Sequence, residues 1–483
     1  MLVIAIGSVV VVVVWALWNA RRLERERRQV CAHVQPDEVW QRAHDDKVAR
    51  IAAFLRHRDS DRPLVLRKRV ASHQVPKAAD LKYSDDALDI RDLDRILDID
   101  PVARTCTAEP GVTFIDLVAA TLELGLVPIL VPEFKTITIG GAVAGCAVES
   151  MSFQEGGFHD GCLEYEVITA KGEVLVCTPD NEHALLFQMM HGTFGTLGVL
   201  SKLKFKLVPA QPFVKVSYQK FTSLAAYKAA IWHHYQARDM DFMDGIVHAP
   251  DECVLSLGRF VDWAPFTNRY DWTKAYCEST NTLAEDYLKT ADYFFRYDRG
   301  VTSVHPKSTL GRLLFGKFLG SSQVLELAAR AHWLLGTTKP TVTVDVFIPF
   351  SKIDAFIEWC TAEFGFFPLW VVPYRRGHDY EWISDGFFKT LNDELFVDLA
   401  IYGMKQQDEK NHYKIIEDKL LEMGGVKTLI SHNYYSEQDF WKTWNKSNYD
   451  AVKAKTDPNN VFRDLYSKTC RATWGIEGET ASP

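Results

Sequence analysis

The sequence lacks paired cysteines and an excess of positive charge, and each absence argues against a class of protein. Its nine cysteines are scattered and include no C-x-x-C pair. Neither a disulfide framework nor a metal site is therefore indicated, and a reducing compartment fits the folded part. The net charge of -8 at pH 7 disfavours a nucleic-acid partner, because duplex binding relies on a basic surface that neutralises phosphates.

Long hydrophobic runs are also scarce, apart from one at the amino terminus. Residues 2–18 carry no charge, and this length is at the short end of what spans a bilayer as a helix. Five arginines follow between residues 21 and 28, whereas no basic side chain precedes the run. The positive-inside rule then places the large domain in the cytoplasm. We expect a single-pass anchor over residues 2–20, in the endoplasmic reticulum of a eukaryote; a cleaved signal peptide is the alternative.

What is present is a globular chain of 483 residues with 47% hydrophobic residues, enough for two or three domains. Helical periodicity is seen over 36–60 and 113–126, and short strand-length runs lie between them. A hairpin is predicted at Lys171-Gly172, and 199–209 alternates as a half-buried strand does. After a predicted domain boundary at 209–212 the composition turns aromatic. Strands separated by polar helices are predicted there at FVKVSYQKF, TVTVDVFIP, FPLWVVPY and LFVDLAIYG.

The strongest local pattern is the run of small residues from Thr136 to Ser150, TITIGGAVAGCAVES. We expect an alternating strand that leads into Gly140-Gly141. Because glycine lacks Cβ, backbone N–H groups can approach a pyrophosphate and a flat ring can lie against the chain. The spacing is neither the Rossmann G-x-G-x-x-G nor a P-loop. Taken alone, the run is equally compatible with a dinucleotide cradle and with a tightly packed turn.

Three further motifs follow this run in order: Gly156-Gly-Phe-His-Asp160, then Tyr165-Glu-Val with Lys171-Gly172, then GTFGTLG over 192–198. Together they resemble the FAD-binding domain of the p-cresol methylhydroxylase (PCMH) type, found in vanillyl-alcohol oxidase and its relatives. The resemblance implies bound FAD. The residues predicted to contact it are Ser72, Thr136, Thr138, Ile139, Gly140, Gly141, Ala142, Gly145, Glu149, Ser150, Gly156, His159, Asp160, Gly195, Thr196 and Gly198.

Within that superfamily the chain resembles the Δ24-sterol reductase family most. The motifs that carry this narrower resemblance are TIGGAVAGCAVES, 158–160, 177–179, 195–198, 292–300, 368–373 and Asp398 with Tyr402-Gly403. It implies an α+β fold with a two-subdomain, PCMH-type FAD-binding domain over 36–210. An antiparallel-sheet substrate (cap) domain over 211–436 and a segment over 437–475 that returns to the FAD domain complete the expected organisation.

The resemblance also implies a reaction. NADPH reduces the flavin, flavin N5 gives a hydride to a carbon of an isolated alkene, and an acid protonates the other carbon. Candidates for the acid are His159, Tyr402 and His432, with Glu149 and Tyr434 considered beside them. Arg296 and Asp298, as an ion pair, and Trp370 are candidates for substrate contact. Structural roles are the alternative in each case: a strand end for Tyr402, a turn cap for His432 and a solvated pair for Arg296 with Asp298.

One segment departs from the family pattern. Many relatives have a glycine-rich loop where this chain has Arg67–His73. Ser72 is expected to keep a phosphate hydrogen bond, with the basic residues supplying the electrostatic attraction. Relatives with covalent flavin carry histidine just before this serine, and Ala71 stands there instead, so non-covalent FAD is expected.

Two other functions stay open. One is an FAD-dependent oxidase or dehydrogenase of a sugar, polyol or lactone, which predicts a polar pocket. The other is a redox-inactive, membrane-tethered binding protein, favoured only by the altered Arg67–His73 loop. For the reductase, the expected partners are a sterol or related lipid and the membrane, and the sequence assigns no oligomeric state.

Overall fold

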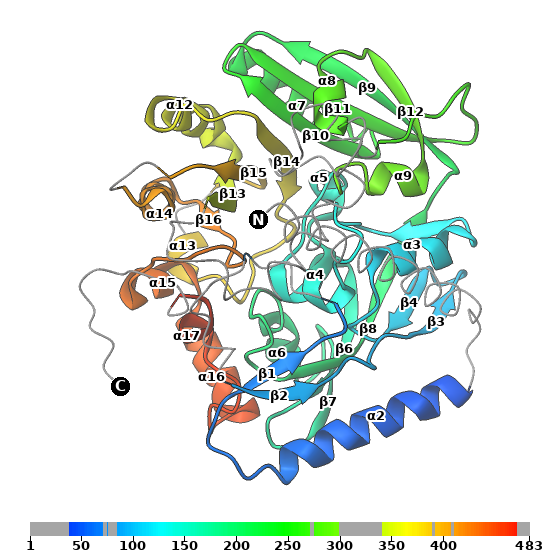
Figure 1. Ribbon diagram of the computed structural model, residues 1–483, viewed down its shortest axis with the longest axis vertical. Coiled ribbons are helices and arrows are strands. Elements are labelled where there is room, and N and C mark those ends of the chain that lie inside the picture. Colours follow the sequence, from blue (N-terminus) through cyan, green and yellow to red (C-terminus); the bar gives the residue numbers. More distant parts are fainter. Residues whose placement is uncertain are drawn as a thin grey trace, which may run out of the picture.

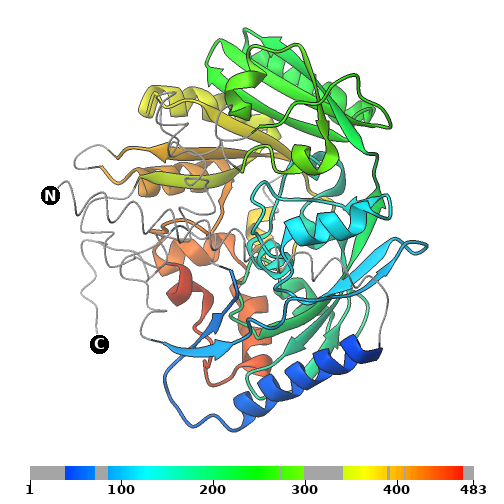
Figure 2. The same cartoon turned by 45° about the vertical axis from the view of Figure 1, so that its right-hand side comes forward.

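The computed structural model describes residues 38–70, 75, 85–270, 275–298, 341–388, 392–406 and 410–470. These residues form two bodies stacked along the long axis of the molecule (Figures 1 and 2), a lower one in blue, cyan and red and an upper one in green and yellow. The anchor predicted over 2–20 lies outside the described residues. Within the described ranges, no helix is both long and apolar enough to cross a membrane.

The lower body starts with the predicted amphipathic helix, α2 (Glu38–Arg56), which buries Val48, Ile51 and Leu55. Two parallel strands, β1 (Leu64–Arg67) and β2 (Asp86–Asp89), follow it. A six-stranded antiparallel sheet then runs in the order β3-β4-β8-β6-β7, with β5 paired to β8. Its strands are β3 (Ile96–Asp100), β4 (Thr105–Ala108), β5 (Leu126–Pro128), β6 (Cys162–Ile168), β7 (Val174–Cys177) and β8 (Val199–Pro209).

Several predictions for the lower body are confirmed. The helix expected over 113–126 is α3 (Phe114–Leu122). The hairpin joins β6 to β7, and Gly172 adopts the left-handed φ of 73° that its turn requires. The helix α6 (Ala184–Met189) precedes the glycine-rich turn of residues 192–198.

The prediction of a strand that leads into Gly140-Gly141 is wrong. Thr138 instead begins a short helix, α4 (Ile139–Gly145), and its hydroxyl accepts a hydrogen bond from Gly141 N at 3.2 Å. A threonine in this position satisfies a helix N–H that a strand would not present. Two further short helices follow, α5 (Ser152–Glu155) and the 3-10 helix η2 (Phe158–Gly161).

The upper body is an antiparallel sheet of eight strands in the order β12-β9-β11-β10-β14-β15-β13-β16. Four of them are the strands predicted from the sequence, whereas β10, β11 and β12 occupy a region where helices were expected. The strands are β9 (Phe213–Phe221), β10 (Phe242–Ala249), β11 (Glu252–Val261), β12 (Glu285–Lys289), β13 (Val342–Pro349), β14 (Leu369–Arg375), β15 (Leu395–Met404) and β16 (Val426–Lys427). The helix α9 (Thr290–Phe294) lies between the sheet and the lower body, whereas α8 (Tyr276–Thr280) lies higher, beside β11 (Figure 1).

The two faces of this sheet have different neighbours. Alternate residues such as Val344, Val371 and Leu399 form an apolar core with the helices α7 (Leu224–Ala237), α12 (Ile353–Glu363) and α14 (His412–Met423). The residues between them point the other way, because side chains alternate along a strand. We call this second side, which faces the lower body, the inner face.

The last helices pack against the lower body. They are α15 (Glu437–Thr443), α16 (Lys446–Thr456) and α17 (Leu465–Thr469), drawn in orange and red in Figure 1. Backbone hydrogen bonds join Leu64 N to Val461 O at 2.7 Å and Ala170 N to Thr456 O at 2.9 Å. The carboxyl-terminal residues therefore help to fix β1 and the β6–β7 hairpin.

Candidate functional site

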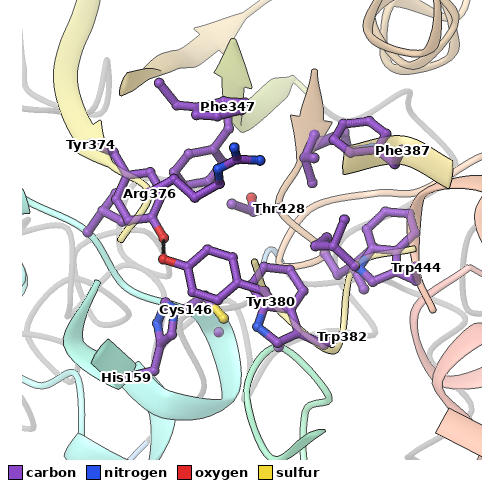
Figure 3. A pocket seen from close by; sticks show the side chains of 18 of the residues that line it. Cys146, His159, Phe347, Tyr374, Arg376, Tyr380, Trp382, Phe387, Thr428 and Trp444 are labelled. Atoms are coloured by element: carbon purple, nitrogen blue, oxygen red, sulfur yellow. Dashed lines mark hydrogen bonds between the residues drawn. The ribbon is translucent and has the colours of Figure 1, made fainter. Parts of the chain in front are cut away.

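A cavity lies between the two bodies (Figure 3). Its lower wall comes from the end of α4, from η2 and from the glycine-rich turn. Its upper wall comes from the inner face and from the segment 376–387. The space between atoms is about 730 Å³, part of which is open to solvent, and ligand sites of about 300–1,000 Å³ are usual. The lining residues are Gly145, Cys146, Val148, His159, Gly192, Phe194, Phe347, Tyr374, Arg376, Tyr380, Trp382, Ile383, Phe387, Phe396, Val426, Lys427, Thr428, Leu429 and Trp444.

Most of this lining is apolar and aromatic. The charged residues in the lining are Arg376 and Lys427, and Lys427 is paired with Glu417 behind the wall. The lining also includes the imidazole of His159. A ligand rich in hydroxyl groups would lose hydrogen bonds with water here and regain few of them. The cavity therefore suits a flat or greasy ligand better than a sugar.

The glycine-rich turn forms part of the lower wall. Gly192, Phe194 and Gly195 have φ of 67°, 51° and 70°, a left-handed conformation that favours glycine. The ammonium groups of Lys453 and Lys468 donate hydrogen bonds to the carbonyls of Thr196 and Phe194, at 2.8 and 2.7 Å. The turn is thus held from behind by α16 and α17, and its front is left for a ligand. At the far end of the turn, Gly198 packs so closely that a Cβ would lie 2.9 Å from Ile168 O.

The helix α4 does not present the free N–H groups expected of it. Gly140 N donates to Pro110 O at 2.9 Å and Gly141 N to the Thr138 hydroxyl, so both are satisfied within the chain. A Cβ at Gly140 would lie 2.5 Å from Pro110 Cβ, which gives this glycine a packing role. Gly145 differs, since it lines the cavity and a Cβ there would meet nothing closer than Ile430 at 3.9 Å.

The other small residues of this run have mixed positions. Ile139 and Ala142 are buried in the core, so they could contact a cofactor only through their backbone. Thr136 is half-buried in the turn before α4. Their assignment to FAD stays a prediction, as do those of Thr138 and the glycines.

His159 is the predicted site residue with the most suggestive surroundings. It is buried in the cavity wall, and neither ring nitrogen makes a hydrogen bond within the described residues. Burial lowers its pKa, although Asp160 opposes the shift, so the imidazole is neutral at pH 7. Its ring lies 4.9 Å from that of His191 and 5.3 Å from that of Tyr380. Its Nε2 lies 3.6 Å from Asp160 Oδ2. A buried ring that faces a cavity and makes no hydrogen bond among the described residues fits a polar group of a bound ligand.

Asp160 fixes the part of the cavity wall beside His159 by accepting two hydrogen bonds. Its Oδ2 accepts hydrogen bonds from Gly157 N at 2.7 Å and from the Tyr380 hydroxyl at 3.0 Å. Burial alone would raise its pKa, but His159, His378 and the Gly157 N–H lower it to about 2. Gly156 is required next to it, since its φ is 81° and a Cβ would lie 2.3 Å from Asp160 Oδ2.

The prediction that Arg296 and Asp298 form an ion pair is wrong. Arg296 is fully buried, and its Nη2 lies 3.0 Å from Glu149 Oε1 and 3.0 Å from Asp244 Oδ1. Asp298 pairs with Lys135 instead, at 3.4 Å. A buried guanidinium requires carboxylates that are themselves buried, and Glu149 and Asp244 meet that requirement.

We call Arg296, Glu149 and Asp244 the buried ion cluster. The rings of Tyr276, Tyr293 and Tyr297 lie 4.0–5.2 Å from the guanidinium carbon. Ser150 donates hydrogen bonds to Glu149 from both its N–H and its hydroxyl, and Trp370 Nε1 donates to Asp244 Oδ2 at 3.0 Å. Four predicted site residues are therefore brought together in and around this cluster, but they do not line the cavity: Glu149, Ser150, Arg296 and Trp370.

The remaining catalytic candidates also lie outside the cavity lining. Tyr402 donates a hydrogen bond to Asp345 on the neighbouring strand. His432 packs against Tyr413 with ring centres 5.4 Å apart, and its carbonyl accepts from Lys427. Their catalytic roles are not supported by this arrangement. Tyr434 is half-buried beside the same Tyr413 ring.

The altered loop is described only in part. Ser72 lies outside the described residues. Arg69 lies 3.4 Å from Asp94 and 3.6 Å from Asp116, so two carboxylates balance its charge. Arg69 is thus not a free positive group of the kind expected to attract a phosphate.

Sequence reasoning missed most of the upper wall. Tyr374 could have been found, because it follows Trp370 and Val372 at a period of two and so shares their face of β14. Tyr380, Trp382 and Phe387 lie on the irregular segment after β14, where no periodicity marks them. Trp444 follows α15 and reaches the cavity only through the tertiary fold.

The chain is similar to known proteins of the families that its motifs resemble. Residues 22–178 match the family model of an FAD binding domain. The chain is 24% identical over 397 residues to the Delta(24)-sterol reductase of Homo sapiens, covering 78% of this chain and 76% of that protein. The Caenorhabditis elegans homologue of that reductase is 24% identical over 420 residues (78% and 77%), and the Arabidopsis thaliana enzyme 23% over 481 residues (89% and 85%). The predicted resemblance is confirmed.

Proposed function

We propose that this FAD-dependent oxidoreductase, a relative of the Δ24-sterol reductases, reduces a side-chain carbon–carbon double bond of a sterol or related isoprenoid lipid, with NADPH as electron donor. The observation that carries the proposal is the apolar cavity, which has motifs of the FAD-binding domain on one wall and the inner face on the other. Bound FAD would supply the hydride-transfer chemistry. The protein's own residues must bind and orient the cofactor and the substrate and exclude water.

The residues of the cavity fit a flat ring system. Gly145 leaves space that a side chain would fill. The aromatic rings of Trp382 and Tyr380 stack on each other with their centres 5.2 Å apart, and the Trp382 ring lies against Gly192, where it adds a flat apolar surface. His159 offers a neutral imidazole without a hydrogen-bond partner among the described residues. Together these residues can bind and orient an aromatic cofactor without a covalent link.

The upper wall suits an alkene. An isolated double bond offers no polar group to grip, so its position must be set by shape and by exclusion of water. Phe347 and Phe396 on the inner face, with Trp444, provide such a surface. We further propose that residues 2–20 anchor the protein in a membrane with its catalytic part in the cytoplasm, since its substrate would dissolve in the bilayer.

The two alternatives are less consistent with the cavity. An oxidase of sugars, polyols or lactones needs several convergent polar groups, and the lining supplies few. A redox-inactive binding protein would not need the left-handed glycine turn to be fixed by Lys453 and Lys468.

Rapid-mixing absorbance of the detergent-solubilised full chain tests the proposal. Anaerobic mixing with NADPH should bleach the visible flavin band, and a Δ24-unsaturated sterol should restore it. Bleaching by a sugar, polyol or lactone but not by NADPH would overturn the proposal in favour of the oxidase. Purified protein that retains no FAD would overturn it in favour of the binding protein.

A further inference from the structure

Reduction of an alkene consumes a proton as well as a hydride, and the cavity is mostly apolar. Its exceptions near the lower wall are two tyrosine hydroxyls, those of Tyr374 and Tyr380, which meet in a hydrogen bond (Figure 3). Both tyrosines line the cavity. The question is whether they are connected to a source of protons.

A continuous chain of polar groups leads from these hydroxyls to solvent. The Tyr380 hydroxyl lies 3.0 Å from Asp160 Oδ2, and the other oxygen of Asp160 lies 3.3 Å from His378 Nε2. The side chain of His378 is 48% exposed, whereas that of Asp160 is 11% exposed. The chain thus starts at the surface, passes through a buried carboxylate and ends on a tyrosine in the cavity wall.

The ionisation of these groups is suited to proton transfer. Contact with the Asp160 carboxylate raises the pKa of His378 above its ordinary 6.5, so this imidazole keeps its proton to a higher pH than a free imidazole does. Burial raises the pKa of both tyrosines well above 10, which keeps them protonated. The other charged or titratable groups near His378 are His159, His191, Asp379 and Arg376.

We propose that His378, Asp160, Tyr380 and Tyr374 form a proton path from solvent into the cavity, with Tyr374 protonating the substrate carbon. This inference rests on the proposed reductase function. One alkene carbon receives a hydride that originates from NADPH. The other forms a C–H bond as the O–H bond of Tyr374 breaks. Tyr374 regains a proton from Tyr380. His378 then passes its proton to the ionised carboxylate of Asp160, which relays it to Tyr380, and His378 takes a new proton from water, so no charge accumulates.

The direct test separates the two half-reactions in full-length, FAD-loaded protein. Tyr374→Phe removes the hydroxyl and keeps the ring, so reduction by NADPH should stay near the wild-type rate. Reoxidation by sterol should fall by about 100-fold or more, the usual contribution of a general acid. The matched control is Tyr270→Phe, which removes a buried tyrosine bonded to Asp286 outside the cavity lining and should leave both rates unchanged.

The pH dependence tests the outer end of the path. His378 supplies protons below its raised pKa and stops doing so as the pH rises through that value. Sterol-dependent reoxidation should therefore decline on the alkaline side in the wild type, and His378→Gln should be slow and lack that limb. A readout independent of turnover is the NMR titration of His378, whose pKa should return toward 6.5 in Asp160→Asn.

The outcomes separate this inference from the function on which it rests. If wild-type protein reduced by NADPH is not reoxidised by sterol, both fail. If it is reoxidised and Tyr374→Phe matches it at every pH, the function stands and the proton path is overturned. Loss of FAD or of thermal stability in Tyr374→Phe but not in Tyr270→Phe would assign Tyr374 to cofactor binding or folding, which also overturns the path.

Discussion

Two regions of the inner face differ in their chemistry. Around β10, near the centre of the sheet, the buried ion cluster fills the space between the bodies, and Asp244 is in contact with Arg296, Tyr297 and Trp370. Toward β13, Phe347, Tyr374 and Phe396 leave a cavity. The difference shows how charge holds the two bodies together in one region while an uncharged surface in the other stays available for a ligand.

A second set of buried carboxyl groups, those of Glu133, Asp345 and Asp398, lies close together at the inner face. Burial raises the pKa of Asp345 to about 6 and that of Asp398 well above its ordinary value, and Asp398 is further raised by Asp345 and by Glu133. Glu133 itself has a pKa of about 8 because it is buried. These buried carboxyl groups therefore hold their protons to a higher pH than exposed carboxyl groups do.

Removing the cation of the ion cluster should have the largest effect. Arg296→Met leaves Glu149 and Asp244 buried without a partner, which should cost about 3–5 kcal/mol of unfolding free energy. The measurement is denaturant unfolding followed by tryptophan fluorescence. Arg259→Met is the control, because Arg259 is 54% exposed in its pair with Asp239 and should change stability by less than about 1 kcal/mol. Equal effects would show that the cluster does not hold the bodies together.

The protonated carboxyls predict a pH dependence of stability. Because the folded-state pKa of Glu133 is about 8 and its ordinary value is 4.5, its contribution falls as the pH rises between these values, by up to about 1.4 kcal/mol per pH unit. Glu133→Gln should flatten this decline in melting temperature, whereas exposed Glu123→Gln should not. A decline that persists unchanged in Glu133→Gln would mean that Glu133 is ionised in the folded protein.

Filling the cavity should weaken ligand binding and leave the fold intact. Thr428 lines the cavity and its hydroxyl makes no hydrogen bond within the described residues, so Thr428→Val should behave as wild type. Thr428→Trp should raise the KM for sterol by about tenfold or more with the NADPH step retained. Normal sterol kinetics in Thr428→Trp would place the substrate elsewhere.

The smallest effects should distinguish two glycines of α4. Gly140→Ala forces a Cβ against Pro110, and overpacking of this kind costs about 1–3 kcal/mol. Gly145→Ala meets no close neighbour and should keep its melting temperature, but it should release FAD more readily if the cofactor lies against it. Retention of FAD by Gly145→Ala at the wild-type level would argue that the ring lies elsewhere.

The sequence predicted what periodicity and turn chemistry encode locally. The strand FVKVSYQKF is β9, from Phe213 to Phe221, and the hairpin at Gly172 is present. The strands β10 and β11 were missed because they are buried on both faces over most of their length, which removes the alternation that marks a half-buried strand. The partners of Arg296 could not be predicted, since Glu149 and Asp244 approach it only through the tertiary fold. The same holds for the cavity, whose walls come from segments far apart in the chain.

An experimental structure of the FAD-loaded protein tests the central claim most directly. The account predicts that the isoalloxazine ring lies in the cavity against Gly145, with the inner-face side chains of Phe347 and Tyr374 on its other side. Density for the ring elsewhere, with this cavity left empty, would contradict the account.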